Sequence, residues 1–176
     1  MAHPSAWQRW WLEQWPHRLS IRRHVPRFLR ACPEPFRGRV LEVGAGTGWT
    51  SRTILETYPQ VELTATDSDP RATDRFTRLQ DHYGRRLHVQ PADIYTLPFD
   101  RGAFDMVVAF HVINHLADVT TAIQHLMRVV RPGGLVGILD SVKRDPVTAA
   151  LEAEATLLVN KGETVYYLWA QKAYPF

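Results

Sequence analysis

Short apolar, β-branched runs alternate with polar, amphipathic stretches along most of the chain, and this alternation predicts repeated βα units around a mostly parallel sheet. The predicted strands lie at 39–43, 61–66, 86–90, 104–109 and 134–139, with a last strand at 164–173. The predicted helices lie at 47–58, 70–82, 118–130 and 146–160. The runs FDMVVAF and GLVGIL are apolar nearly throughout, which is typical of central strands covered on both faces. The pattern therefore predicts an α/β fold with helices on both faces of the sheet.

Length and composition favour a single domain. The chain has 176 residues, 45% of them hydrophobic, which is enough for one core and too little for two ordinary domains. We expect one domain over 1–176, in which 1–36 forms a helical lid or interfacial segment and 37–176 forms the core. The sequence has no apolar run of membrane-spanning length and no cleavable leader, and its lone Cys32 excludes an internal disulfide. These features predict a cytoplasmic protein.

The most specific motif is VLEVGAGTGWTS, in which an apolar run ends in Gly44, Gly46 and Gly48 and a helical pattern follows at once. Side chains at Gly44 and Gly46 would stand between the backbone and a ligand lying across the strand ends, so glycine allows close approach. A dinucleotide site usually has the spacing G-x-G-x-x-G, which cradles a pyrophosphate. Here the spacing is G-x-G-x-G with Glu42 beside it, and an acidic side chain suits a ligand with an ammonium and no phosphates.

A second acidic position, Asp67, ends the next predicted strand about twenty residues after the glycine turn. A carboxylate at that place can accept hydrogen bonds from both hydroxyls of a ribose. The alternative is that Asp67 caps the following helix, although Asp69, directly before Pro70, is the better candidate for the cap. Together with the glycine turn, Asp67 indicates a site for an adenosine-containing ligand.

Four motifs in order, over roughly residues 38–140, resemble those of the class I S-adenosylmethionine-dependent methyltransferases. They are EVGAGTG, the acidic strand end at Asp67, ADIYTLPF, and FDMVVAFHVINHL leading to LMRVVRPGG. The resemblance implies a Rossmann-like three-layer sandwich with an antiparallel C-terminal strand. It also implies S-adenosylmethionine as cofactor, S-adenosylhomocysteine as product and methyl transfer as the reaction.

The resemblance assigns nine cofactor-binding residues: Glu42, Gly44, Ala45, Gly46, Asp67, Ser68, Asp93, Ile94 and Ala109. The glycine turn would line the methionine portion, while Glu42 and the carbonyl of Ala109 would meet its ammonium. Asp67 would hold the ribose, and Asp93 would face the adenine amino group with Ile94 beside the ring. The alternative for Asp93 is an ordinary loop aspartate that stabilises the turn before Ile94.

His111, close to the end of the strand predicted at 104–109, is the candidate for acceptor contact or general base. Methyl transfer depends mainly on alignment and exclusion of water, so a base is useful only when the acceptor atom carries a proton. The alternative for His111 is a hydrogen-bonded packing residue, and we interpret His115 as a structural part of the local turn. These two histidines have helical spacing, but no carboxylate or cysteine nearby in the sequence completes a metal site, and none is predicted.

Four of the six tryptophans have helical spacing: Trp7, Trp10, Trp11 and Trp15. They lie on a helix predicted to end near Pro16, within a segment, 1–36, that holds six arginines against two glutamates. Tryptophan and arginine together suit peripheral contact with a membrane, whereas the alternative is a lid that packs over the cofactor and excludes water. The excess of positive charge is confined to this one segment and an NPPY-like sequence is absent, and both observations disfavour nucleic acid.

The predicted function is methyl transfer to a small-molecule or amphiphilic acceptor, such as a lipid or quinone. The segment AFHVINHLAD also resembles methyltransferases of quinone biosynthesis and some bacterial phospholipid N-methyltransferases. Only one convincing strand follows the helix at 146–160, where similar enzymes have two, so the acceptor pocket would be truncated or shared within a homodimer. The competing hypothesis, which the short C-terminal part favours, is a non-catalytic cofactor-binding or regulatory subunit.

Overall fold

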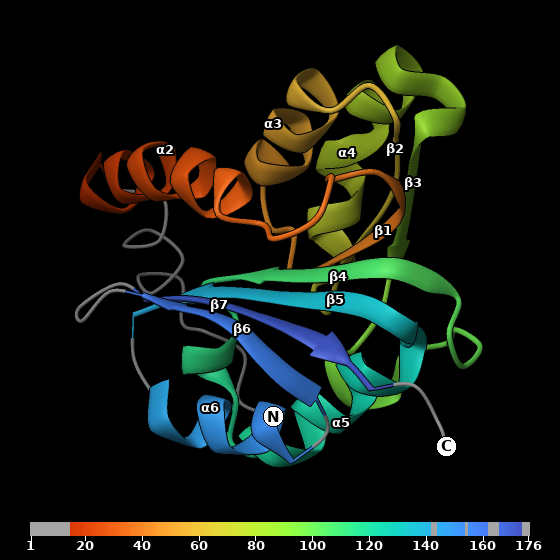
Figure 1. Cartoon of the computed structure of the whole chain (residues 1–176). Coiled ribbons are helices and arrows are strands. Elements are labelled where there is room, and N and C mark those ends of the chain that lie inside the picture. Colours follow the sequence, from red (N-terminus) through yellow and green to blue (C-terminus); the bar gives the residue numbers. More distant parts are fainter. Residues whose placement is uncertain (1–14, 142–143, 154, 162–165, 174–176) are drawn as a thin grey trace.

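A computed structural model describes residues 15–141, 144–153, 155–161 and 166–173, in which seven strands form one sheet between two helical layers (Figure 1). The strands are β1 (Gly38–Val43), β2 (Val61–Asp67), β3 (Leu87–Pro91), β4 (Phe104–Phe110), β5 (Val130–Asp140), β6 (Ala155–Lys161) and β7 (Tyr166–Lys172). The helices are α2 (Trp15–Arg30), α3 (Trp49–Thr57), α4 (Pro70–Tyr83), α5 (Val119–Val129) and α6 (Arg144–Glu152). Three short 3-10 turns are η1 (Gly84–Arg86), η2 (Ile94–Thr96) and η3 (Ile113–His115).

The strand order is β3-β2-β1-β4-β5-β7-β6. The first five strands of this order are parallel, whereas β7 is antiparallel to β5 and β6 is antiparallel to β7. Helices α2, α3 and α4 cover one face of the sheet, and α5 and α6 cover the other (Figure 1). The predicted α/β, Rossmann-like fold with a mostly parallel sheet is therefore confirmed.

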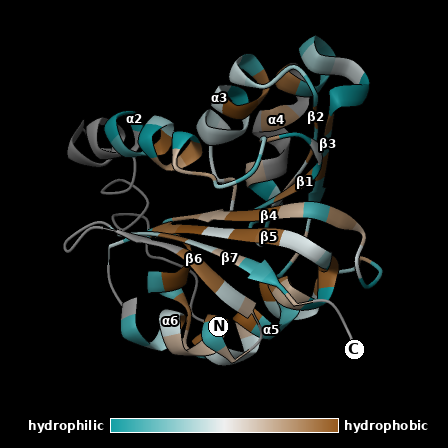
Figure 2. Ribbon diagram, in the orientation of Figure 1, coloured by the Kyte–Doolittle hydropathy of each residue, from teal (hydrophilic) through white to brown (hydrophobic). Residues whose placement is uncertain are grey.

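The sheet separates two hydrophobic clusters, and neighbouring residues of one strand belong to different clusters. In β4, for example, Val107 packs with residues of α5 and α6, whereas Val108 packs with residues of α2, α3 and α4. Figure 2 shows that the central strands β4 and β5 are largely hydrophobic and that the helices carry much of their hydrophilic surface on the outside. This burial on both faces explains why these strands lack the alternation of polar and apolar residues.

Trp169 of β7 fixes α2 to the sheet. Its ring is fully buried, stacks on Phe28 at 4.5 Å between ring centroids, and donates a hydrogen bond from Nε1 to the Phe28 carbonyl oxygen at 3.2 Å. Val25 and Leu29 of α2 are buried in the same cluster. The N-terminal helix that the structure describes is therefore part of the core.

The prediction of a helix over 146–160 is wrong for the second half of that range. Helix α6 ends at Glu152, and Ala155 begins β6, which pairs with β7 along its whole length. Alanine and leucine are good helix formers, but pairing with β7 decides the conformation of this stretch. The C-terminal part therefore contains both antiparallel strands, and the argument for a truncated pocket does not hold.

The helix that we predicted to end near Pro16 lies almost entirely outside the described residues, so its end stays a prediction. Pro16 lies in the first turn of α2, where its missing N–H has no helical partner to lose, and the helix continues to Arg30. Trp7, Trp10 and Trp11 lie outside the described residues, and of Trp15 only the backbone, at the start of α2, is described.

Gly137 of β5 gives the first testable prediction. A Cβ built on it would lie 2.6 Å from Trp169 and 2.7 Å from Phe28. We predict that Gly137→Ala lowers the free energy of unfolding by about 1–3 kcal/mol, because two packed rings must move. Denaturant titration measures this loss. If overpacking is the cause, Phe28→Leu will lower the free energy of unfolding by less in the Gly137→Ala variant than in the wild type. Equal losses in the two backgrounds would contradict overpacking.

Candidate functional site

The strand order reverses between β1 and β4, and the carboxyl ends of the parallel strands meet at one edge of the sheet. In open α/β sheets, ligands bind outside the carboxyl ends of the strands at such a switch point. Three of the sequence motifs converge here, because the glycine turn follows β1, Asp67 ends β2 and His111 follows β4. The fold therefore brings the predicted site residues to one edge.

The three glycines of the turn all have positive φ, but the space beside each is different. A Cβ at Gly44 would collide with Val112, so the space that we expected a ligand to use is filled by the chain itself. A Cβ at Gly48 would lie 2.7 Å from Phe76 of α4. Beside Gly46 the nearest atom is the Gly44 carbonyl oxygen, at 4.0 Å. Gly46 is therefore the glycine that borders open space, and this cradle fits a ligand lying against the backbone.

Glu42 lies behind the turn and is fully buried. Its carboxylate accepts hydrogen bonds from the hydroxyls of Thr50 and Ser51 at the start of α3. Burial raises the pKa of Glu42 to about 7, and the Asp67 carboxylate adds to this rise while the two hydroxyls oppose it. In this position Glu42 ties the end of β1 to the first turn of α3. Thr50 and Ser51 are partners that our sequence interpretation missed.

Asp67 binds the glycine turn directly. Its Oδ2 accepts a hydrogen bond from the Gly46 N–H at 2.8 Å, and its Oδ1 accepts one from the Asp69 N–H at 2.9 Å. Asp69 caps α4 by accepting a hydrogen bond from the Arg71 N–H, so the predicted choice of cap is confirmed. Ser68, between them, is exposed. The Asp67 carboxylate therefore holds the turn and also borders the space beside Gly46.

Asp93 reaches the same edge through β3. The Ala92 N–H donates to the Asp67 carbonyl oxygen at 3.0 Å, which joins the ends of β2 and β3. Asp93 Oδ1 accepts a hydrogen bond from the Tyr95 N–H at 2.9 Å and caps η2, and Ile94 is buried. The hydrogen bond between Asp93 and Tyr95 is what we expect if Asp93 stabilises the turn before Ile94. Contact of Asp93 with adenine stays a prediction.

The end of β4 brings Ala109 and His111 to the edge. Ala109 is fully buried and lies in register with Val43 and Ile138. His111 has a φ of 54°, and its N–H donates to the Leu139 carbonyl oxygen at 2.8 Å. Residues other than glycine are uncommon at positive φ, and such positions cluster at functional sites.

Asp140, at the end of β5, is a site residue that the sequence interpretation missed. It is fully buried, and its carboxylate accepts hydrogen bonds from the N–H groups of Ser141 at 2.7 Å and Asn114 at 3.2 Å. Its Oδ1 lies 4.0 Å from His111 Nδ1. Burial raises the pKa of Asp140, although the backbone amides and the charge of His115 act against the rise. An acidic residue ending an apolar strand, as at Asp67, was the signal that could have identified it.

The segment after β4 contains two histidines at helical spacing, His111 and His115. His115 is exposed, and among the residues that the structure describes no three His, Cys, Asp or Glu side chains come together as possible metal ligands.

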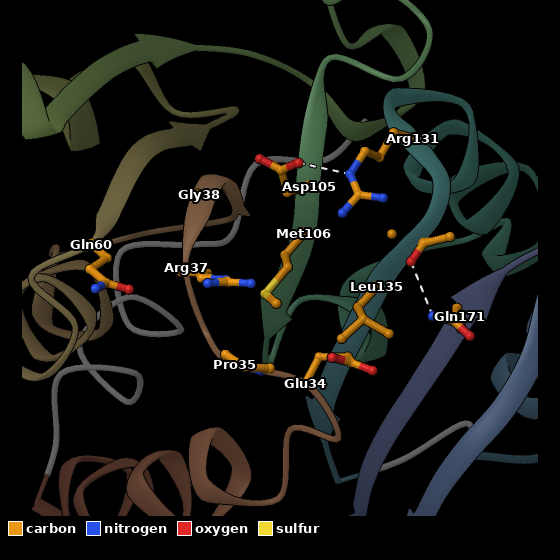
Figure 3. Close-up of a pocket in the computed structure, with 12 residues that line it drawn as sticks. Glu34, Pro35, Arg37, Gly38, Gln60, Asp105, Met106, Arg131, Leu135 and Gln171 are labelled. Carbon is orange, nitrogen blue, oxygen red and sulfur yellow. Dashed lines mark hydrogen bonds and ion pairs between the residues drawn. The ribbon is translucent and has the colours of Figure 1, made fainter.

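A second hollow lies at the opposite, amino-terminal edge of the parallel strands. It has a volume of about 460 Å³ and is lined by residues that include Arg37, Asp105, Met106, Arg131 and Gln171 (Figure 3). Arg131 Nε contacts Asp105 Oδ1 at 2.8 Å. Burial alone would raise the pKa of Asp105, but hydrogen bonds and charges from Arg131 and Arg39 lower it. The glycine turn, Asp67 and His111 follow the carboxyl ends of β1, β2 and β4 at the other edge, so this hollow is separate from the candidate site.

Comparison with known proteins identifies the family. Residues 40–134, more than half of the chain, match the family model described as a methyltransferase domain. The chain belongs to the methyltransferase domain family. The predicted resemblance is therefore confirmed: this is a class I, Rossmann-like methyltransferase domain, and its cofactor is S-adenosylmethionine.

Two curated relatives are similar over much of this methyltransferase. A malonyl-[acyl-carrier protein] O-methyltransferase of Halorhodospira halophila is 32% identical over 127 residues, which cover 70% of this chain and 43% of that protein. A demethylmenaquinone methyltransferase of Thermus thermophilus is 31% identical over 119 residues, which cover 68% of this chain and 52% of that protein. The chain thus spans about half the length of these relatives.

Solved structures show the same fold at low sequence identity. A SAM-dependent methyltransferase from Aquifex aeolicus has a TM-score of 0.76 at 16% identity, covering 98% of this chain and 100% of that chain. The [4+2]-cyclase SpnF has a TM-score of 0.78 at 16% identity, covering 87% and 82%. Because a cyclase shares the fold, the fold alone does not decide the chemistry.

Glu42 gives a prediction about stability and pH. Because its folded pKa of about 7 lies above the ordinary 4.5, the folded protein keeps a proton that the unfolded chain releases between these values. The contribution of Glu42 to stability is therefore fully present below about pH 4.5 and is lost as the pH rises through about 7. The loss is of the order of 3 kcal/mol.

Glu42→Gln should remove this dependence. Glutamine has no titrating proton, keeps one acceptor for the Thr50 hydroxyl and offers an N–H to the Ser51 oxygen. Denaturant titrations of both proteins at about pH 5 and pH 8 measure the difference, with Glu62→Gln on the exposed side of β2 as control. Parallel pH curves for the wild type and Glu42→Gln would contradict the buried, neutral carboxyl.

Proposed function

We propose that this methyltransferase transfers a methyl group from S-adenosylmethionine to a small-molecule or amphiphilic acceptor. The observation that carries the proposal is the open space beside Gly46, bordered by the Asp67 carboxylate at the switch point of the sheet. When bound, the cofactor supplies an electrophilic methyl group on a sulfonium.

Each part of the cofactor has a candidate partner at this edge. The backbone of Gly44, Ala45 and Gly46 would hold the methionine portion, together with the Ala109 carbonyl. Asp67 and the exposed Ser68 would bind the ribose, and Asp93 and Ile94 would hold the adenine. In this proposal Glu42 does not touch the cofactor. Both of its carboxyl oxygens accept hydrogen bonds from hydroxyls of α3, so it positions the backbone of the glycine turn.

The amphiphilic acceptor rests on the two relatives. Their names give malonyl-[acyl-carrier protein] and demethylmenaquinone as the compounds on which those proteins act. One is an acyl chain on a carrier and the other a quinone, so both join a reactive polar group to a larger body. An acceptor of this class matches the sequence prediction for this chain.

His111 is the candidate to receive a proton from such an acceptor. Its side chain lies beside the buried Asp140 carboxylate, which would stabilise an imidazolium formed during the reaction. Asp140 also holds η3 through the Asn114 N–H, so it acts as a positioning residue for this segment. Phe28 of α2 packs against Phe110, directly before His111, and can help to exclude water.

The competing interpretation, a non-catalytic subunit, loses its main support, because β6 and β7 complete the sheet. The expectation of a pocket shared within a homodimer loses the same support. Turnover of any acceptor would decide between an enzyme and a regulatory subunit.

The first test is calorimetric titration with S-adenosylmethionine and S-adenosylhomocysteine. We predict that Asp67→Ala weakens binding by about 10- to 100-fold, because a charged acceptor for hydroxyl and N–H groups is lost. Asp81→Ala, at an exposed position of α4, is the matched control and should bind as the wild type does. Absence of binding by the folded wild-type protein would overturn the proposed function.

The second test concerns His111. Asparagine tolerates positive φ, so His111→Asn preserves the backbone. We predict that kcat falls by about 10²- to 10⁴-fold with malonyl thioester or quinol acceptors, while affinity for S-adenosylmethionine is unchanged. The control is His115→Asn, at an exposed position four residues further on. Unchanged kcat in His111→Asn would show that the reaction needs no base at this position.

A further inference from the structure

Helix α2 is strongly basic. Its sixteen residues include five arginines and no aspartate or glutamate. Four of these arginines have exposed side chains: Arg22, Arg23, Arg27 and Arg30. At about 100° per residue, these four positions fall within an arc of about 140° on the helix. We call this surface the arginine face.

Packing on the other side of α2 fixes the direction of the arginine face. Val25, Phe28 and Leu29 are buried against the sheet, so the helix cannot rotate without exposing its apolar side. The arginine face therefore points away from the sheet. Figure 2 shows hydrophilic colouring on the outside of α2.

Within the described residues, the charges of the arginine face are not compensated by ion pairs. Elsewhere, Arg52 pairs with Glu56 and Arg131 pairs with Asp105, but across the described residues no ion pair joins the arginine face to a carboxylate. The positive charge of this face also affects His24. Burial lowers the pKa of His24, and the charges of Arg27 and Arg23 lower it further. A single-signed surface of this kind attracts anions.

The arginine face lies on the outside of the helix that covers the acceptor edge. His24 and Tyr167 share a hydrogen bond, and Tyr167 pairs with Leu139, whose carbonyl oxygen accepts from the His111 N–H. On the same helix, Phe28 lies 5.3 Å from Phe110 between ring centroids. Whatever binds the arginine face is therefore held close to the strand ends where the acceptor would react.

We propose that the arginine face of α2 docks on the anionic headgroups of a membrane. Three tryptophans precede α2 at helical spacing with Trp15, its first residue, and indole rings at a membrane interface complement arginines that meet anionic lipid. This favours a lipid surface over an acidic protein or a nucleic acid. No described helix is long and apolar enough to cross a membrane, so the contact would be peripheral. The proposal deepens the proposed function, on which it rests, because it makes a membrane-held amphiphile the acceptor.

The test is co-sedimentation of the full chain with phosphatidylcholine vesicles, with and without about one third phosphatidylglycerol. We expect binding to the anionic vesicles only, weakened by high salt because salt screens the charges. Each basic residue near an anionic surface contributes about fivefold to binding, so Arg23→Gln/Arg27→Gln should lower it about 25-fold. The control, Arg85→Gln/Arg101→Gln, removes the same charge from exposed positions elsewhere and should bind normally.

Three outcomes would overturn the proposal. They are no binding of the wild type to anionic vesicles, unchanged binding of Arg23→Gln/Arg27→Gln, and an equal loss in the control variant, which would mean that net charge alone decides. If the first outcome were accompanied by retention on an acidic carrier protein or a nucleic acid, the arginine face would belong to that other partner.

Calorimetry with S-adenosylmethionine on the same proteins separates this proposal from the proposed function. We expect every variant to bind the cofactor as the wild type does, because the arginine face does not touch the cofactor edge. A wild type that binds vesicles but no cofactor would contradict the proposed function and leave docking intact. A wild type that binds cofactor but no vesicles would contradict docking alone.

Discussion

Two carboxyl groups hold the turn between β1 and α3, and the rest of the candidate site depends on that turn. Glu42 engages the hydroxyls of Thr50 and Ser51, which ties the strand end to the helix start. Asp67 accepts the Gly46 N–H, which ties the turn to β2. Burial of the Glu42 carboxyl raises its pKa to about 7, whereas the Asp67 side chain is only partly buried. One acidic residue therefore serves the architecture, and the other remains available to a ligand.

The opposite side of the site depends on packing more than on polar contacts. Trp169 and Phe28 hold α2 against the sheet, and Phe28 also contacts Phe110 beside His111. The end of β4 is thus coupled to α2, whose outer face is basic. One layer of aromatic rings joins the basic outer face of α2 to the segment after β4.

The differences between prediction and structure share a cause. Residues 155–160 have reasonable local propensity for a helix, but their pairing with β7 makes them a strand. Gly44 was predicted to leave room for a ligand, but Val112, distant in the sequence, fills that room. Asp140 was overlooked because its importance comes from the segment after β4 folding back onto the end of β5. In each case the deciding partner lies far away along the chain.

The sequence by itself determined the α/β class, the five parallel strands, the family and the edge at which the cofactor motifs gather. The periodicity of apolar residues and short motifs are local properties of the chain, and both can be recognised in a sequence when no tertiary contact is known. Only the tertiary structure decided which glycine borders open space, that the Glu42 carboxyl is buried beneath the turn, and that Asp140 lies beside His111. These facts depend on contacts between side chains of different strands and layers. Local sequence patterns do not show which distant side chains come into contact.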